Sequence, residues 1–133
     1  MMRIKKLFVA ALLLVAPLAL TAQENSDWAN TSKYVQANAE VTVRPRAVLF
    51  GDSITEGWEK KDPDFFTANN YIGRGISGQT TSQILVRMQQ DVVSLRPKYV
   101  VILCGINDIA QNPGHAVNIE AAVDYLKSMC NIA

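Results

Sequence analysis

Residues 47–53, AVLFGDS, decide the fold of this chain. A short apolar run is stopped by Gly51, and a run of this length is typical of a buried β-strand rather than of a helix. A second, weaker strand is expected at Tyr71-Ile72 and a third at Tyr99–Cys104. The third run is apolar throughout, which predicts a strand that is covered on both faces of the sheet.

Helical patterns alternate with these strands. A short helix is predicted over Asp62–Asn69, where Pro63 suits the first helical position, and longer helices over Thr81–Leu95 and Ala116–Cys130. In both longer helices apolar residues recur at steps of three and four. Strands that alternate with helices predict a parallel sheet with right-handed crossovers, and therefore a doubly wound α/β sandwich in three layers.

The apolar steps also predict which side of each longer helix is buried. In the first, the apolar side comprises Ile84, Leu85, Met88, Val92 and Leu95. Arg87, Gln90 and Asp91 fall elsewhere on that helix. In the second, the apolar side comprises Ile119, Ala122, Val123, Leu126 and Met129.

The first 22 residues are set apart from the fold. Arg3, Lys5 and Lys6 precede an apolar run over residues 7–20, which is the pattern of a secretory signal peptide. The run is shorter than the about 20 residues that a membrane-spanning helix needs. We therefore expect cleavage near Ala22 and export, periplasmic or secreted, without a stable membrane anchor.

Length and charge indicate one small domain. The chain has 133 residues, with 13 Lys and Arg against 12 Asp and Glu. Removal of the signal peptide takes away three basic residues and leaves a slight acidic excess, so nucleic acid is not the implied partner. Residues 23–46 are polar and are predicted to form a lead-in arm with a short helix around Trp28–Val35. Residues 47–133 then form the domain.

The residues directly after each predicted strand carry the chemistry. In open α/β sheets, ligands bind beyond the carboxyl ends of the strands. Ser53 follows the first strand, a glycine-rich turn at 73–78 the second, and Asn107 the third. A hydroxyl nucleophile, backbone N–H groups at Ser53 and Gly78, and a side-chain amide are the parts that acyl transfer requires, because its tetrahedral intermediate develops an oxyanion. Ser53 is therefore either the nucleophile of an acyl-transfer site or an ordinary serine of a strand-to-helix turn.

Three blocks of the sequence resemble the SGNH, or GDSL, family of lipases and acylhydrolases, which are serine esterases. The blocks are Gly51-Asp52-Ser53, Ile76-Ser77-Gly78-Gln79-Thr80 and Gly105-Ile106-Asn107-Asp108. The resemblance covers residues 47–133 and implies that Ser53 is the nucleophile and that Gly78 and Asn107 are oxyanion-hole donors. The residues that it implies as supports are Gly51, Asp52, Gly105 and Asp108.

The same resemblance implies more about fold and substrate. It implies a flavodoxin-like sandwich with central strand order 2-1-3-4-5 and no required cofactor or metal. It also implies a small-molecule substrate, which we expect to be a carboxylic ester of a carbohydrate or lipid with a short acyl group such as acetyl.

Two features depart from the family pattern. Gly73 stands where close relatives usually have asparagine, which puts in doubt a supporting hydrogen bond beside the oxyanion turn. The family's Asp-x-x-His block is absent, because the sequence ends at Ala133 within the third predicted helix. We therefore expect a domain truncated after about three strands, inactive and of low stability, with the strand at 99–104 as an open edge that invites aggregation. The alternative is a non-catalytic, carbohydrate-binding relic that has lost the base.

Several polar residues allow more than one interpretation. His115, the single histidine, is expected in a solvent-facing loop rather than as the base, since a base must reach the serine hydroxyl and be oriented by a third group. Asp52 and Asp108 suggest either an acid pair or hydrogen bonds that order the turns. Cys104 and Cys130 either form a disulfide in this exported chain or remain two buried thiols.

Two further patterns have a functional and a structural interpretation. Gly73, Gly75 and Gly78 spell Gly-x-Gly-x-x-Gly, the pattern of a dinucleotide-binding turn. Such a turn needs an acidic residue at the end of the next strand, which here ends in Cys104-Gly105, so we do not expect nucleotide binding. A cluster of aromatic residues either lines an acyl pocket or packs in the core. It comprises Trp58, Phe65 and Phe66.

Overall fold

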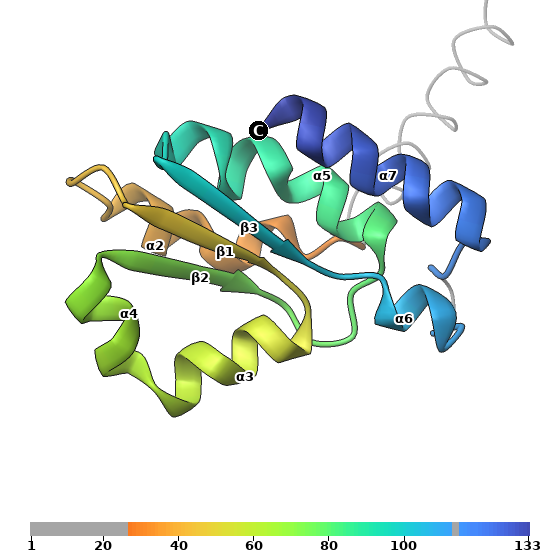
Figure 1. Ribbon diagram of the computed structural model, residues 1–133, viewed down its shortest axis with the longest axis horizontal. Coiled ribbons are helices and arrows are strands. Elements are labelled where there is room, and N and C mark those ends of the chain that lie inside the picture. The colour runs from red at the N-terminus through yellow and green to blue at the C-terminus, as the bar shows by residue number, and fades with distance from the viewer. Residues whose placement is uncertain (1–26, 113–114) are drawn as a thin grey trace, which may run out of the picture.

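The computed structural model describes residues 27–112 and 115–133, so the predicted signal peptide and its cleavage site lie outside the described residues. Three strands form one parallel sheet in the order β2-β1-β3 (Figure 1). They are β1 (Ala47–Gly51), β2 (Tyr71–Gly75) and β3 (Tyr99–Leu103). The predicted parallel sheet, with its first strand at the centre, is confirmed.

Helices cover the two faces of this sheet and complete a flavodoxin-like α/β fold (Figure 1). One face carries α3 (Ser53–Lys61) and α4 (Pro63–Asn69). The other carries α5 (Thr81–Asp91) and α7 (Ile119–Ile132), which contact each other. A single turn of helix, α6 (Ile106–Ile109), directly follows β3.

The core lies on both sides of β1, because successive side chains of a strand point to opposite faces. Val48 and Phe50 point toward α5 and α7 and are fully buried. The cluster on that side comprises Val48, Phe50, Ile84, Met88, Val92 and Met129. Ala47 and Leu49 point the other way and pack against Phe66 of α4. Burying a large apolar side chain contributes about 1.5–3 kcal/mol, so these two clusters are the main source of stability.

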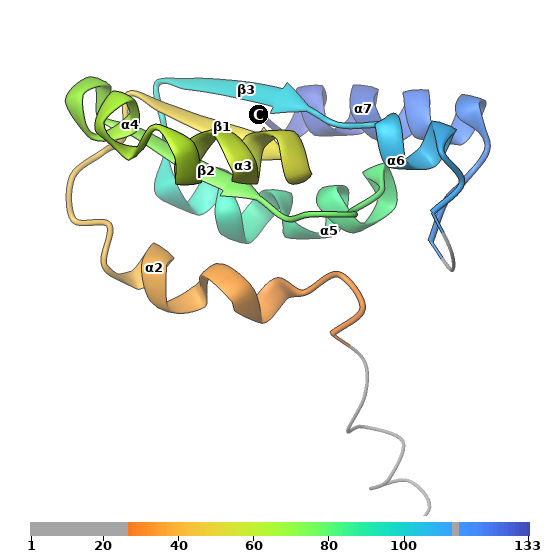
Figure 2. The same cartoon turned by 90° about the horizontal axis from the view of Figure 1, so that it is seen from below.

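The predicted lead-in arm is an integral part of the domain. It contains a 3-10 turn, η1 (Thr31–Tyr34), followed by α2 (Val35–Ala39), so its helix lies further along the chain than residues 28–35. Both run beside α5 (Figure 2). Three glutamine side chains of the domain donate to backbone carbonyls of the arm, and each bond is 2.6 Å long. The pairs are Gln79 with Ala29, Gln83 with Trp28, and Gln90 with Thr31.

The sequence indicates a helical turn after Ser53, but it does not predict a helix of the length of α3. Its apolar residues Ile54 and Trp58 are 52% and 43% exposed, whereas Thr55 and Glu56 are the buried residues of the helix. A helix that buries polar side chains has no apolar stripe, so periodicity cannot reveal it. What starts this helix is a cap, because the Asp52 carboxylate accepts the N–H of Ile54 at 3.0 Å.

Other boundaries shift by a few residues. Strand β2 extends through Gly73 to Gly75, so two glycines expected in a turn belong to a strand. The helix predicted to reach Leu95 ends as α5 at Asp91, and a separate 3-10 turn, η2 (Val93–Leu95), follows. Helix α7 begins at Ile119 rather than Ala116, because the Asn118 side chain caps the N–H of Ala121 at 2.8 Å.

Arg87 and Asp91 of α5 do not lie on a solvated side of the helix. Both side chains are 0% exposed and form an ion pair of 2.6 Å. The guanidinium also donates to the carbonyl oxygens of Arg74 and Gly51, at 3.3 and 3.4 Å, and lies 4.9 Å from the centre of the Phe50 ring. This polar cluster therefore joins α5 to the carboxyl ends of β1 and β2.

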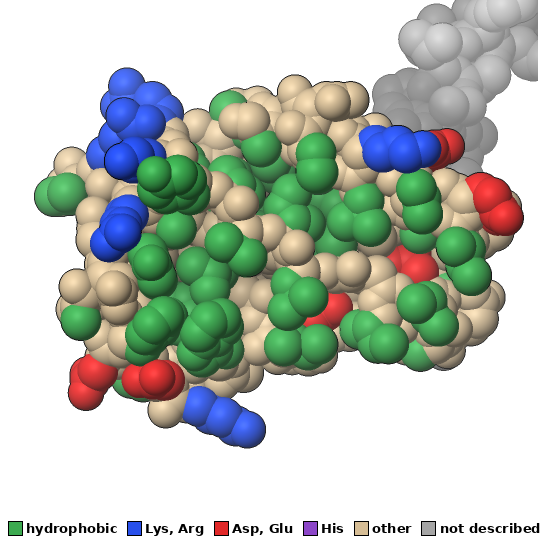
Figure 3. Space-filling view, viewed as in Figure 1, with side chains coloured by type: hydrophobic (Ala, Val, Ile, Leu, Met, Phe, Trp, Pro, Cys, Tyr) green, Lys and Arg blue, Asp and Glu red, His purple; other side chains and the backbone are tan. Residues whose placement is uncertain are grey.

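Strand β3 is covered on one face only, contrary to the prediction from its apolar run. Tyr99, Val101 and Leu103 are 53%, 50% and 46% exposed, whereas Val100 and Ile102 pack against the core. Apolar side chains gather over this face in the space-filling view (Figure 3). The strand is also an outer strand of the sheet, as predicted from the order 2-1-3.

The two cysteines are unpaired. Cys104 is half-buried at the end of β3, but Cys130 on α7 is exposed, so the expectation of two buried thiols is wrong for Cys130. Burial, together with the nearby carboxylates of Asp52 and Asp108, raises the pKa of Cys104 to about 12. This thiol therefore stays protonated at neutral pH and is a poor nucleophile.

Candidate active site

The three sequence blocks meet at the carboxyl edge of the sheet. Gly51 pairs with Gly75 in β2 and with Leu103 in β3, so the three strands end at the same level. The chain leaves each strand toward the same side (Figure 1). The turns that carry Ser53, Gly78 and Asn107 therefore share one edge, as sequence reasoning predicts for a doubly wound sheet.

Ser53 is the first residue of α3 and is exposed. It lies directly beyond the central strand, where the first N–H groups of a helix lack partners within the helix. Gly51 permits the close approach of β3 to the end of β1, because a Cβ at Gly51 would lie 2.1 Å from the carbonyl oxygen of Leu103. The nucleophile predicted from sequence is thus accessible and rests on a tightly packed backbone.

Asp52 stabilises the turn between β1 and α3. It is 1% exposed, and one carboxylate oxygen caps α3 through the N–H of Ile54. The other oxygen, Oδ2, is buried and has no hydrogen-bond partner among the described residues. Burial raises the pKa of Asp52, and the bond from Ile54 only partly opposes this. Asp52 therefore serves as a helix cap rather than as an exposed acid.

The second turn presents the Gly78 backbone. The N–H of Gln79 donates to the carbonyl of Ile76 at 3.3 Å, and Gly78 has a φ of 79°, a conformation that favours glycine. Gly78 is exposed at the edge of the sheet. The N–H groups of Ser77 and Gln79 are bonded within the domain, so the turn offers the Gly78 N–H to a ligand.

Glu56 holds this second turn in place. Its Oε2 accepts the backbone N–H of Ser77 at 2.7 Å and also the Ser77 hydroxyl. Its Oε1 accepts Lys33 of the arm at 2.8 Å and Lys60 at 2.7 Å. The carboxylate is thus the point where the arm, α3 and the Gly78 turn meet. Sequence reasoning missed it, and the one signal was the spacing of Glu56 and Lys60, which is common on exposed helices.

Glu56 makes a pH-dependent contribution to stability. Burial raises the pKa of this carboxyl, but hydrogen bonds from its two lysine partners and from Ser77 outweigh burial and hold the pKa well below its ordinary value. A carboxyl whose pKa is lower in the folded state stabilises the fold above its unfolded pKa of about 4.3. That contribution disappears as the pH falls through the folded pKa.

We expect Glu56→Gln to lower the free energy of unfolding by about 1.5–3 kcal/mol at pH 7, because charge-assisted hydrogen bonds are lost. The difference from the unsubstituted protein should shrink steadily as the pH falls below about 4.3. Urea unfolding between pH 7 and pH 3 measures it. Glu40→Gln, at an exposed position of the arm, is the matched control. A deficit that is constant across this range would contradict the role of the Glu56 charge.

The turn after β3 is hydrogen-bonded directly to the turn after β2. The Asn107 amide donates from Nδ2 to the carbonyl of Gln79 at 2.8 Å. Asp108, which is 1% exposed, accepts the N–H of Thr81 at 2.8 Å and its hydroxyl at 3.1 Å. Asp108 therefore orders the start of α5 and is not aimed at solvent as one of an acid pair.

Gly73 and Gly75 allow α3 to pack closely against β2. Gly73 donates its N–H to Glu59 Oε1 at 3.0 Å, and a Cβ at Gly73 would lie 2.4 Å from the Glu59 carboxylate. The space of the asparagine expected there is thus occupied by Glu59. A Cβ at Gly75 would lie 2.3 Å from the backbone nitrogen of Glu56, so Gly75 lets α3 approach β2. Because both glycines lie within β2, the Gly-x-Gly-x-x-Gly pattern forms no phosphate-binding loop.

The aromatic cluster lies at the opposite edge of the sheet. Trp58 and Phe65 stack at 5.2 Å, and Phe66 is 3% exposed in the core. Trp58 and Phe65 also line an open groove of about 640 Å³, together with the first residues of the strands, such as Tyr71 and Tyr99. The groove is therefore at the amino ends of the strands, so these aromatic residues do not line a pocket beside Ser53.

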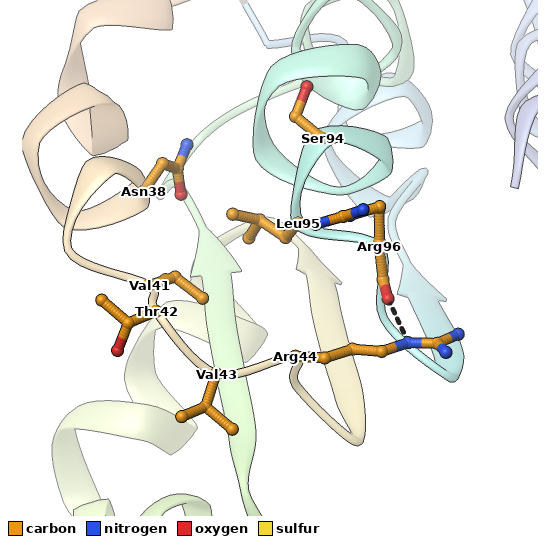
Figure 4. Close-up of a pocket in the computed structure, with 8 residues that line it drawn as sticks. All are labelled: Asn38, Val41, Thr42, Val43, Arg44, Ser94, Leu95 and Arg96. Carbon is orange, nitrogen blue, oxygen red and sulfur yellow. Dashed lines mark hydrogen bonds between the residues drawn. The ribbon is translucent and has the colours of Figure 1, made fainter.

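A second hollow, of about 450 Å³, lies between the arm and η2 (Figure 4). It is lined by Asn38, Val41, Thr42, Val43, Arg44, Ser94, Leu95 and Arg96. Arg44 Nε donates to the carbonyl of Arg96 at 2.6 Å across it, as the dashed line shows. Its residues directly precede β1 and β3, so it too lies away from the edge that carries Ser53.

His115 lies in the loop before α7 and is exposed. Its ring lies 5.4 Å from that of Trp28, and its carbonyl accepts the Thr80 hydroxyl at 3.0 Å. The loop position agrees with the sequence prediction of a solvent-facing residue. Among residues 27–112 and 115–133, no group of three or more His, Cys, Asp and Glu side chains is arranged to hold a metal ion.

The chain is a flavodoxin-like α/β protein whose three strands end at the same level, with a serine in the turn after the central strand. Proteins of known structure share this architecture. A Bacteroides fragilis NCTC 9343 protein assigned as an acylhydrolase is 46% identical, with a TM-score of 0.75 over 82% of this chain. A GDSL-like lipase of Bacteroides thetaiotaomicron VPI-5482 is 44% identical, with a TM-score of 0.72 over 79% of this chain. Residues 49–133 match the model of the GDSL-like Lipase/Acylhydrolase family, and the chain belongs to this family.

Two curated relatives match this chain over part of their own length. The isoamyl acetate-hydrolyzing esterase 1 homolog of Bos taurus is 36% identical over 70% of this chain and 43% of its own length. The uncharacterized lipoprotein YqeF of Bacillus subtilis is 33% identical over 58% of this chain and 37% of its own. The chain spans 54% and 53% of the two Bacteroides proteins. In the described part of the chain, no helix has the length and apolar character needed to cross a membrane.

Proposed function

We propose that the protein hydrolyses carboxylic esters through an acyl-enzyme on Ser53. The observation that carries this proposal is the exposed Ser53 hydroxyl at the start of α3, beside two turns joined by the hydrogen bond from Asn107 to Gln79. The Ser53 oxygen attacks the ester carbonyl carbon, and its proton passes through a base to the departing alcohol. Water then cleaves the acyl-serine bond and releases the acid.

The oxyanion of each tetrahedral intermediate would be bound by three donors. These are the backbone N–H groups of Ser53 and Gly78 and the Asn107 amide, which retains a second hydrogen beyond the one given to Gln79. The proton acceptor is expected in the part of the domain that the longer relatives have and this chain does not span, because His115 packs beside Trp28. No step of this scheme needs a metal or cofactor.

The proposed substrates are esters of carbohydrates or lipids with short acyl groups, such as acetyl. The bovine relative is named for the hydrolysis of isoamyl acetate, an acetyl ester, which supports a short acyl group. The lipoprotein relative supports action outside the cytoplasm, as does the basic and apolar start of the sequence.

Covalent labelling tests this function. The full-length protein, with any residues that precede or follow this chain, is treated with a fluorophosphonate and digested for mass spectrometry. We expect the label on Ser53, and faster hydrolysis of p-nitrophenyl acetate than of the octanoate and palmitate esters. A protein that takes no label and hydrolyses none of these esters, yet binds acetylated oligosaccharides in calorimetry, would instead be a non-catalytic binding protein.

A further inference from the structure

Asn112 touches both residues that are proposed to donate to the oxyanion. It lies in the loop after α6, and its Nδ2 donates to the carbonyl of Gly78 at 3.0 Å and to Asn107 Oδ1 at 3.1 Å. Its backbone N–H also donates to the carbonyl of Asn107 at 3.0 Å. One amide therefore joins the turn after β2 to the turn after β3.

The Asn112 bond and the Gln79 bond together fix which way the Asn107 amide points. A side-chain amide can rotate by half a turn, which exchanges a donor for an acceptor. The carbonyl of Gln79 can only accept, so it selects Nδ2 on its side of Asn107, and Asn112 selects Oδ1 on the other. With the amide in this orientation, the second Nδ2 hydrogen of Asn107 is available to a ligand. In the reversed orientation, an oxygen would face the developing negative charge.

Asn112 also limits the freedom of Gly78. Glycine has the most backbone freedom of any residue, and Gly78 adopts a left-handed conformation with a φ of 79°. Glu56 accepts the N–H of the preceding residue, Ser77, and Asn112 donates to the carbonyl oxygen of Gly78 itself. The Gly78 N–H is thus fixed from both flanks, as a preorganised oxyanion donor requires.

We infer that Asn112 is a positioning residue, which sets the direction of the Gly78 and Asn107 donors without touching the substrate. This inference rests on the proposed ester hydrolysis at Ser53. It predicts an effect on the transition state rather than on substrate binding, because the donors act on charge that develops during the reaction. Loss of one oxyanion donor lowers kcat by about 10²–10³-fold, so misdirecting donors should lower kcat by about 10–100-fold.

Asn112→Asp and Asn112→Ala test the inference in the full-length protein. Aspartate keeps the size of asparagine, but its carboxylate only accepts hydrogen bonds and so opposes the oxygens of both Gly78 and Asn107. Alanine removes the contact without opposing it. We expect Asn112→Asp to reduce kcat for p-nitrophenyl acetate more than Asn112→Ala, with KM changed less than threefold for both. Asn131→Asp, at an exposed position of α7, is the matched charge control and should keep kcat.

A spectroscopic measurement separates positioning from general destabilisation. In ¹⁵N-labelled protein the Asn107 side-chain amide should show two resolved, shifted proton signals, which move toward those of a free amide in Asn112→Ala. The inference is overturned if Asn112→Asp and Asn112→Ala keep kcat within twofold, raise only KM, or leave the Asn107 signals unchanged. Failure of the proposed function is distinct, because Ser53→Ala would then retain hydrolysis whatever residue stands at 112.

Discussion

Replacement of Ser53 by alanine should lower kcat/KM for p-nitrophenyl acetate by about 10⁴-fold or more in the full-length protein. Removing the nucleophile leaves only substrate binding and the oxyanion donors, which retain a small part of the rate enhancement in serine hydrolases. The effect should fall on catalysis alone, because Ser53 is exposed and the cap of α3 is Asp52. Steady-state rates and urea unfolding of the same preparation measure both quantities.

Two controls sharpen this result. Ser128→Ala removes a hydroxyl that donates to the carbonyl of Asp124 within α7 at 2.8 Å, and it should leave the rate unchanged. His115→Ala should keep the rate within threefold, because this ring packs beside Trp28. A large loss in His115→Ala would make His115 the base, and an undiminished rate in Ser53→Ala would remove Ser53 from the mechanism.

The sheet and its edge were predictable because β1 and β3 are unbroken apolar runs that end at glycine turns. The order of these runs along the chain, with helices between them, leaves few topologies open. The positions of Ser53, Gly78 and Asn107 follow from the same argument, since each residue closely follows a strand end. Local patterns thus suffice to place the turns that carry these three residues at one edge of the sheet.

The residues that hold those three in place were not predictable, because their roles depend on contacts between distant segments. Glu56 looks like a solvated helix residue until Lys33 of the arm and Ser77 are placed against it. Asn112 stands in a loop without periodicity, and its partners Gly78 and Asn107 come from two different strand ends. Long-range polar contacts of this kind leave no repeating signal in a single sequence.

Arg87 shows the same principle inside the core. Arg87 lies four residues before Asp91, a spacing that is common for ion pairs on exposed helix surfaces. Such an exposed pair usually stabilises a protein by about 0.3–0.5 kcal/mol. Here the arm covers the pair, and Asn38 donates to Asp91 at 2.7 Å. Burial lowers the pKa of Arg87, and the bond to Asp91 opposes that shift. The energetic role of the pair therefore differs from that of an exposed pair with the same spacing.

We expect Arg87→Met to lower the free energy of unfolding by about 3–5 kcal/mol, because it leaves the Asp91 carboxylate buried without its cation. It also removes donors from the carbonyls of Gly51 and Arg74, which lie just before the turns of the site. A loss of this size is a large part of the about 5–15 kcal/mol that stabilises a typical domain.

A double variant distinguishes the uncompensated charge from lost packing. If the buried Asp91 charge dominates, Arg87→Met combined with Asp91→Leu should be more stable than Arg87→Met alone, because an apolar pair can replace a buried ion pair. Urea unfolding of the two single variants and the double variant gives the coupling free energy, which we expect to be at least about 2 kcal/mol. Lys127→Met, which breaks the exposed pair with Asp124, should change stability by less than about 0.5 kcal/mol. Additive losses in the cycle would mean that Arg87 acts through packing and its backbone bonds, and that the ion pair is not what joins α5 to the strand ends.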